Sequence, residues 1–213
     1  MKIAVITASL GGIDKPLPFV DQDIEFTRFY ITEQNAFPFH TVNSGLAAKF
    51  YKILSHRFVP NYDVFVWIDG NVEVKDPGLI RSMVSQLDNA DVVISEHPQR
   101  SSIRQEADFI INEVNNGNAY LQTRYSAKSI NDEANAYGDL DGLYWCGLFA
   151  RRNETTVNKA FDDWFVKNVQ WSNFDQLSFV KIVHDFRLRL SITEWGPFYN
   201  NNHYSLHKHK KLI

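Results

Sequence analysis

The sequence predicts an α/β protein with a mostly parallel central sheet flanked by helices. Short apolar runs rich in β-branched residues, such as Lys2 to Ala8 and Val64 to Ile68, are typical of buried parallel strands. Segments with apolar residues at helical spacing separate these runs, which indicates strands alternating with helices. The chain has 213 residues, of which 44% are hydrophobic, enough for one domain with a sizeable core.

Further elements follow the same reasoning along the chain. Ser44 is a plausible N-cap for a helix, and Pro77 suits the first turn of another. Residues 115–142 are polar and rich in turn signals, which predicts a lid or an acceptor-side insertion. We expect further strands over residues 23–31, 92–94, 143–150 and 188–194, and helices over residues 44–54, 77–87, 102–114, 156–169 and 174–184.

The composition excludes some classes of protein. A net charge of −3 disfavours a nucleic-acid binder. The apolar run at the N-terminus is too short for a membrane span, and the single cysteine, Cys146, fits a reducing, cytoplasmic compartment. The 16 Phe, 9 Tyr and 5 Trp residues indicate either surfaces that stack against sugars or bases, or simply an aromatic core.

Ligands of open parallel sheets bind beyond the carboxyl ends of strands, which directs attention to Ser9, Asp69 and Glu96. Asp69-Gly70-Asn71 offers two oxygen side chains that could hold a divalent metal on a diphosphate. The alternative is a type I′ hairpin turn between Val64–Ile68 and Val72–Val74. Both interpretations hold if the turn itself binds the metal.

Two groups of cations are candidates for phosphate binding. Lys49, Lys52 and His56 share a face if one helix carries all three, although taken alone they are better explained as an exposed basic face. His97 and Arg100 follow a predicted strand, where Arg100 could clamp a phosphate or carboxylate. A structural Arg100–Glu106 ion pair is the alternative.

Asp175 and Gln176 open a predicted helix. The Asp175 carboxylate could act as a base or stabilise developing positive charge, or it could merely interact favourably with the helix dipole. The motifs of dinucleotide-binding, P-loop and serine-hydrolase proteins are absent. The C-terminal histidines His203, His207 and His209 offer one further metal ligand beside Asp69, or they are solvated.

Together these pieces resemble a family of glycosyltransferase-like domains from plants, bacteria and large viruses. The matches run in order from about residue 23 to 180, and include Phe26-Thr27 after Asp23, Lys49 to His56, Phe58, Pro60, Tyr62-Asp63, Trp67 to Asn71, His97-Pro98 with Arg100, Glu106-Ala107 and Asp175 to Phe179. The resemblance implies a GT-A fold, with a Rossmann-like nucleotide-sugar half over about 1–100 and an acceptor and catalytic half over about 101–213. Asp175 and Gln176 would then lie near the anomeric carbon.

The resemblance also implies a UDP-sugar donor and Mn²⁺ or Mg²⁺ at Asp69-Gly70-Asn71. Asn71 replaces the second Asp of the usual pattern, which favours a histidine as a further ligand: His207, with His203 and His209 as alternatives. Thr7-Ala8-Ser9 would hold the nucleoside. Arg28 stands where the family commonly has Asp, so the base contact stays open. Lys52, His56, His97 and Arg100 would offset phosphate charge.

The whole chain is also similar to the amino-terminal domains of capsid-glycosylating proteins from chlorella viruses. That similarity implies a viral capsid glycan as acceptor, UDP-glucose or UDP-rhamnose as donor, host cytoplasm as location, and further domains in a longer chain. Similarity to retaining enzymes favours retention of configuration. Two rival hypotheses are a non-catalytic nucleotide-sugar or carbohydrate-binding module, and a nucleotidyltransferase.

Overall fold

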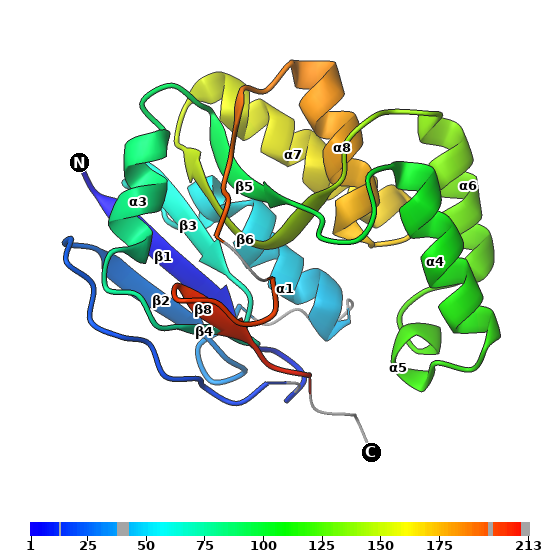
Figure 1. Cartoon of the computed structure of the whole chain (residues 1–213), viewed down its shortest axis with the longest axis horizontal. Coiled ribbons are helices and arrows are strands. Elements are labelled where there is room, and N and C mark those ends of the chain that lie inside the picture. Colours follow the sequence, from blue (N-terminus) through cyan, green and yellow to red (C-terminus); the bar gives the residue numbers. More distant parts are fainter. Residues whose placement is uncertain (13, 38–42, 196–197, 210–213) are drawn as a thin grey trace.

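A six-stranded sheet forms the centre of the computed structural model, which describes residues 1–12, 14–37, 43–195 and 198–209. The strand order is β2-β1-β3-β6-β5-β7, and only β6 runs antiparallel to its neighbours (Figure 1). The predicted α/β class with a mostly parallel sheet is therefore confirmed. The strands are β1 (Ile3–Ala8), β2 (Thr27–Ile31), β3 (Val64–Ile68), β4 (Val72–Val74), β5 (Val92–Glu96), β6 (Tyr144–Arg152), β7 (Leu190–Ile192) and β8 (Tyr204–Leu206).

Helices cover both faces of this sheet because its strands are apolar on both sides. Along β3, Phe65 and Trp67 pack against α1, α7 and α8, whereas Val64 and Val66 face α3. A third apolar cluster joins α4, α6 and the start of α8 beside the sheet (Figure 1). The helices are α1 (Ser44–Ile53), α2 (Ser55–Phe58), α3 (Leu79–Gln86), α4 (Ile103–Asn115), α5 (Ala119–Gln122), α6 (Ala127–Tyr137), α7 (Thr155–Gln170) and α8 (Asp175–Phe186).

The aromatic residues mainly build the core. The rings of Phe149, Phe161, Trp164 and Phe179 contact one another with centroid separations of 4.7 to 6.3 Å. All four side chains are buried. The richness in aromatics is thus explained largely by packing between the sheet, α7 and α8.

The predicted hairpin after β3 is wrong. β3 pairs with β1 and β6, while β4 pairs with β8 in a separate two-stranded sheet. Neither Gly70 nor Asn71 has the positive φ that a type I′ turn requires. The backbone still turns here, since Val72 N donates to Asp69 O at 3.0 Å. Asp69 therefore lies on a turn between two sheets.

Several element boundaries also differ from the prediction. Asn43 caps α1 in place of Ser44, because its side-chain oxygen accepts from Leu46 N at 2.8 Å. The strand predicted over residues 23–31 begins only at Thr27. Residues 115–142 contain α5 and α6, which the polar composition had concealed. Within the described ranges, every helix is too short or too polar to cross a membrane.

A buried polar network joins β6 to α2 and α7. Arg151 is fully buried between the rings of Phe65 and Phe161, and it donates to His56 Nδ1 at 2.9 Å. His56 Nε2 lies 3.0 Å from Asp162 Oδ1. Since Nδ1 accepts from Arg151, the proton of the neutral imidazole belongs on Nε2. Burial and the Arg151 charge lower the pKa of His56 from 6.5 to about 4.

This network predicts a loss of stability in mild acid. The unfolded chain protonates His56 near its ordinary pKa of 6.5, whereas the folded chain resists protonation down to about 4. The free energy of unfolding should therefore fall between these two pH values, because the unfolded state binds more protons. Urea unfolding at several pH values measures this slope. His56→Gln keeps a neutral donor and acceptor and should reduce the slope, leaving the part due to His97, whose pKa is also lowered to about 4. The exposed His184→Gln should leave the slope unchanged. An equal slope in wild type and His56→Gln would contradict the assignment.

Candidate active site

A cavity of about 570 Å³ opens at the carboxyl ends of β1 and β3. Its walls come from the loop after β1, the start of α1, the turn after β3, the α5 region, the start of α8 and the C-terminal segment. This is the expected place for a ligand in an open α/β sheet. Segments from both predicted halves of the chain contribute to it.

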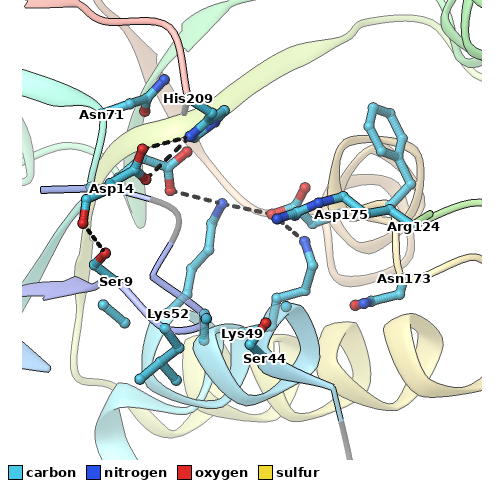
Figure 2. A pocket seen from close by; sticks show the side chains of 18 of the residues that line it. Ser9, Asp14, Ser44, Lys49, Lys52, Asn71, Arg124, Asn173, Asp175 and His209 are labelled. Atoms are coloured by element: carbon cyan, nitrogen blue, oxygen red, sulfur yellow. Dashed lines mark hydrogen bonds and ion pairs between the residues drawn. The ribbon is translucent and has the colours of Figure 1, made fainter. Parts of the chain in front are cut away.

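A buried cluster of charges forms the floor of the cavity (Figure 2). Asp175 Oδ2 lies 2.6 Å from Lys52 Nζ and 2.9 Å from Lys49 Nζ. Lys52 Nζ also lies 3.6 Å from Asp69 Oδ1. Lys52 therefore links the turn after β3 to the start of α8, although these carboxylates are far apart in the sequence.

The cluster keeps Asp175 and Lys52 charged. Burial alone would raise the pKa of Asp175, but the two lysines hold it well below its usual range. Burial acts to lower the pKa of Lys52, yet Asp175 and Asp69 outweigh this effect and raise it. The pKa of Lys49 is lowered, because burial outweighs the attraction of Asp175. Asp175 is thus a permanent carboxylate and a weak base.

Asp69 lies at the edge of the cavity beside a second carboxylate. Trp67 Nε1 donates to Asp69 Oδ1 at 2.6 Å, which orients the side chain. Asp14 Oδ2 would lie only 3.0 Å from a Cβ atom placed on Gly70. A residue larger than glycine at position 70 would displace Asp14, so Gly70 allows the Asp14 side chain to lie close to the turn that carries Asp69.

The described part of the chain contains no group of three or more His, Cys, Asp or Glu side chains arranged to hold a metal ion. Mg²⁺ in nucleotide sites, however, usually takes one or two carboxylates together with phosphate oxygens and waters. The oxygen donors of Asp14 and Asp69 fit a metal that arrives with a diphosphate better than one held by the protein alone.

The C-terminal histidines lie in three different places. His209 lines the cavity, with its Nδ1 2.9 Å from Asp14 Oδ1. His207 Nε2 instead lies 2.7 Å from Glu73 Oε2, outside the cavity wall, and His203 Nδ1 lies 2.5 Å from Asp76 Oδ2. The favoured ligand was His207, but the structure brings the alternative, His209, to the cavity.

Asn71 contributes to the cavity mainly through its position. Its Nδ2 donates to His207 O at 3.0 Å, and His207 N donates to Asn71 O at 2.9 Å. These bonds fasten the C-terminal segment to the turn that carries Asp69.

Two buried amide atoms in the wall lack a protein partner. Asn173 Oδ1 and Gln176 Nε2 have no hydrogen bond, although both residues line the cavity. Asn173 has a φ of 58°, an unusual conformation for a residue with a side chain. Buried polar atoms normally find a partner, and one of these is an acceptor and the other a donor. A ligand hydroxyl has both a donor and an acceptor and so could pair with either atom.

Ala8 and Ser9 line the cavity as predicted for the nucleoside loop, whereas Thr7 is buried in β1 and lies behind it. Arg28 packs on β2 with its Cζ 4.2 Å from the Phe19 ring centroid. Neither Thr7 nor Arg28 is part of the cavity wall.

His56 is also absent from the wall. The expected helix breaks at Leu54, so His56 lies on α2, turned away from Lys52 and into the Arg151 network. The helical spacing of Lys49, Lys52 and His56 was therefore misleading.

His97 and Arg100 form their own network with buried Glu106. Arg100 Nε donates to Glu106 Oε2, and Arg100 N donates to His97 Nδ1 at 3.1 Å. The structural ion pair is thus present, and neither His97 nor Arg100 lines the cavity. The antiparallel strand β6 separates the end of β5 from the ends of β1 and β3, which explains why His97 and Arg100 lie away from the cavity.

Sequence reasoning missed many residues of the wall, among them the polar residues Asp14, Tyr120, Arg124 and Asn173. Asp14 follows a strand end and could have been found by the rule that selected Ser9. Tyr120 and Arg124 lie in the polar insertion, where no motif marks them. Asn173 precedes a predicted helix, where an Asn is ordinarily interpreted as a helix-capping residue.

Comparison with known proteins bears on this site. No curated protein sequence matched the chain. Similar solved structures include mouse xyloside xylosyltransferase 1 in its apo form, with 11% identity over 91% of this chain and 86% of that chain and a TM-score of 0.45. A glycosyltransferase involved in the glycosylation of the major capsid of PBCV-1 has 12% identity over 90% of this chain and 82% of that chain, with a TM-score of 0.44.

The apo structure of the WbbM bifunctional glycosyltransferase has 11% identity over 90% of this chain and 38% of that chain, with a TM-score of 0.48. Likenesses at this level assign no role to individual residues. The family model described as TOD1/MUCI70, glycosyltransferase-like domain, matches residues 32–198. That range spans most of the chain and includes α1, the turn after β3, the α5 region and the start of α8, but neither the loop after β1 nor the C-terminal segment of the cavity wall. The chain therefore belongs to the TOD1/MUCI70 glycosyltransferase-like domain family.

Proposed function

We propose that this protein transfers a sugar from a UDP-sugar to a hydroxyl group of a glycan. One observation carries the proposal beyond family membership: Lys52 joins Asp69 and Asp175 in a single cavity at the strand ends. Such a site has the two features that the reaction needs. Its cations attract a diphosphate, and its carboxylates suit a metal ion bound to that diphosphate. It also offers a fixed negative charge for a sugar that becomes positive as its bond to phosphate breaks.

The proposed donor lies across the wall of the cavity. Ala8 and Ser9 contact the nucleoside, and the diphosphate lies near Asp69 and Lys52. The sugar faces the start of α8, where the unpartnered atoms of Asn173 and Gln176 exchange hydrogen bonds with its hydroxyl groups. The donor panel that tests this arrangement begins with UDP-glucose and UDP-rhamnose, the two donors that the resemblance to chlorella-virus proteins implies.

Mn²⁺ or Mg²⁺ belongs to the same proposal. Asp69 and Asp14 would hold the ion, with Asn71 and His209 beside them. When bound, the ion neutralises charge on the departing diphosphate. The chain's own residues position the groups that would hold the ion. Trp67 orients Asp69, and the hydrogen bond between Asn71 and the C-terminal segment holds this edge of the cavity in place.

The charge state of Asp175 favours retention of configuration. Inverting transfer needs a base that removes the proton of the acceptor hydroxyl. Asp175 is a poor base, because Lys49 and Lys52 keep its pKa low. In the retaining reaction, the bond from the anomeric carbon to the phosphate oxygen breaks and the acceptor oxygen bonds from the same side. The hydroxyl proton passes to the released phosphate oxygen, while Asp175 stabilises the positive sugar.

Substituting Asp69→Asn should reduce metal-dependent turnover by about 100-fold or more, the usual effect of losing one charge-stabilising group. The fold should survive, because the Asp69 side chain is 32% exposed. Release of UDP from each donor measures turnover, with thermal unfolding as the check on folding. Asp88→Asn on the exposed surface is the matched control. Undiminished turnover in Asp69→Asn would overturn the assigned role.

The identity of the products separates this function from its rivals. Glycosyl transfer gives UDP and a glycoside, whereas nucleotidyl transfer gives pyrophosphate or a nucleoside monophosphate. A binding module gives no product at all.

The product sugar should carry the anomeric configuration that it had in the donor. Proton NMR of the anomeric signal of the glycoside product measures this directly, since a glycoside does not mutarotate. A product of opposite configuration would contradict the role given to Asp175, since a separate base would then be required.

A further inference from the structure

The cations of the cavity differ in how they are paired. Lys49 and Lys52 share Asp175, with Nζ to Oδ2 distances of 2.9 and 2.6 Å, and Lys52 also faces Asp69. Arg124 lines the same cavity, yet in the described part of the chain it has no carboxylate within 4.0 Å. Its positive charge is therefore the one in this group that the protein itself does not neutralise.

Arg124 is nevertheless held in place. Its Cζ lies 4.4 Å from the centroid of the Tyr120 ring, which is within range of a cation–π contact. The Tyr120 ring stacks on the His209 ring with centroids 5.6 Å apart and an interplanar angle of 13°. His209 Nδ1 in turn lies 2.9 Å from Asp14 Oδ1. A continuous stack thus ties Arg124 to the C-terminal segment and to the loop after β1.

This arrangement suits anion binding. A guanidinium presents a planar set of donors that matches phosphate, and prior fixation reduces the entropy lost when the ligand binds. Figure 2 shows Arg124 reaching into the space where Lys49, Lys52 and Asp175 meet. An anion bound there would lie between the unpaired guanidinium and the lysines.

We propose that Arg124 binds the diphosphate of the donor and of the UDP product, and that Tyr120 positions it for this task. The inference rests on the proposed function and adds to it a residue from the insertion at residues 115–142. It also gives that insertion a role. The segment supplies a cation to the donor side of the cavity rather than serving the acceptor alone.

Titration of UDP and of uridine into the intact protein tests the proposal, because only UDP carries phosphate. Arg124→Gln should raise the Kd for UDP about 10- to 100-fold, as expected for the loss of one charge-assisted hydrogen bond. The Kd for uridine should not change. Arg124→Lys should recover part of the loss, since it keeps the charge without the planar fork. Arg81→Gln, whose side chain is 59% exposed on α3, is the matched control.

Variants of Tyr120 test the positioning. Tyr120→Phe keeps the ring and should bind UDP as the wild type does, whereas Tyr120→Leu should raise the Kd about 2- to 10-fold through loss of the cation–π contact. An unchanged Kd in Tyr120→Leu would overturn the positioning role.

The outcomes separate this inference from the function on which it rests. Wild-type UDP affinity in Arg124→Gln would overturn the role of Arg124 while leaving the donor site intact. If that variant instead raised only the KM for an acidic acceptor, Arg124 would bind a carboxylate of the acceptor. That result also overturns the proposal. A wild-type protein that binds no UDP would overturn the proposed function itself.

Discussion

The candidate site depends on the buried contact of Asp175 with Lys49 and Lys52. These three groups come from α1 and α8, which pack against the same face of the sheet. Removing one partner of a buried ion pair typically costs about 3–5 kcal/mol, because the remaining charge is left uncompensated. The contact therefore fixes the two helices relative to each other and holds the carboxylate where the strands β1 and β3 end. Trp164 Nε1 donates to Asp175 O at 3.1 Å and adds a second restraint from α7.

The pairing of Lys49 and Lys52 with Asp175 determines which groups of the cavity can bind a ligand. The lysines are largely committed to Asp175, so a bound molecule meets a surface of fixed charges rather than free cations. Among the groups that line the cavity without a protein partner are the buried amide atoms of Asn173 and Gln176. The Arg124 guanidinium also lines it and has no carboxylate partner in the described part of the chain. Hydroxyl groups suit the amides, and phosphate suits the arginine. Both chemistries occur in one molecule when the ligand is a nucleotide sugar.

Sequence reasoning predicted the α/β fold and part of the cavity, since strand ends and helix starts are local features. Ser9, Asp69 and Asp175 were found in this way, and Lys52 through its helical spacing. The hairpin prediction was wrong because β4 pairs with β8, a strand about 130 residues away that no local signal reveals. His56 was misplaced because the helix breaks at Leu54. Arg124 and Tyr120 were missed because tertiary packing alone brings their insertion to the cavity.

The most direct test of the account is calorimetric titration of a panel of nucleotide sugars into the wild-type protein, with and without Mn²⁺. The account predicts that a UDP-sugar binds, that Mn²⁺ strengthens its binding, and that sugars linked to other nucleotides bind more weakly. The absence of binding to every nucleotide sugar under both conditions would contradict the central claim. The cavity would then need another ligand.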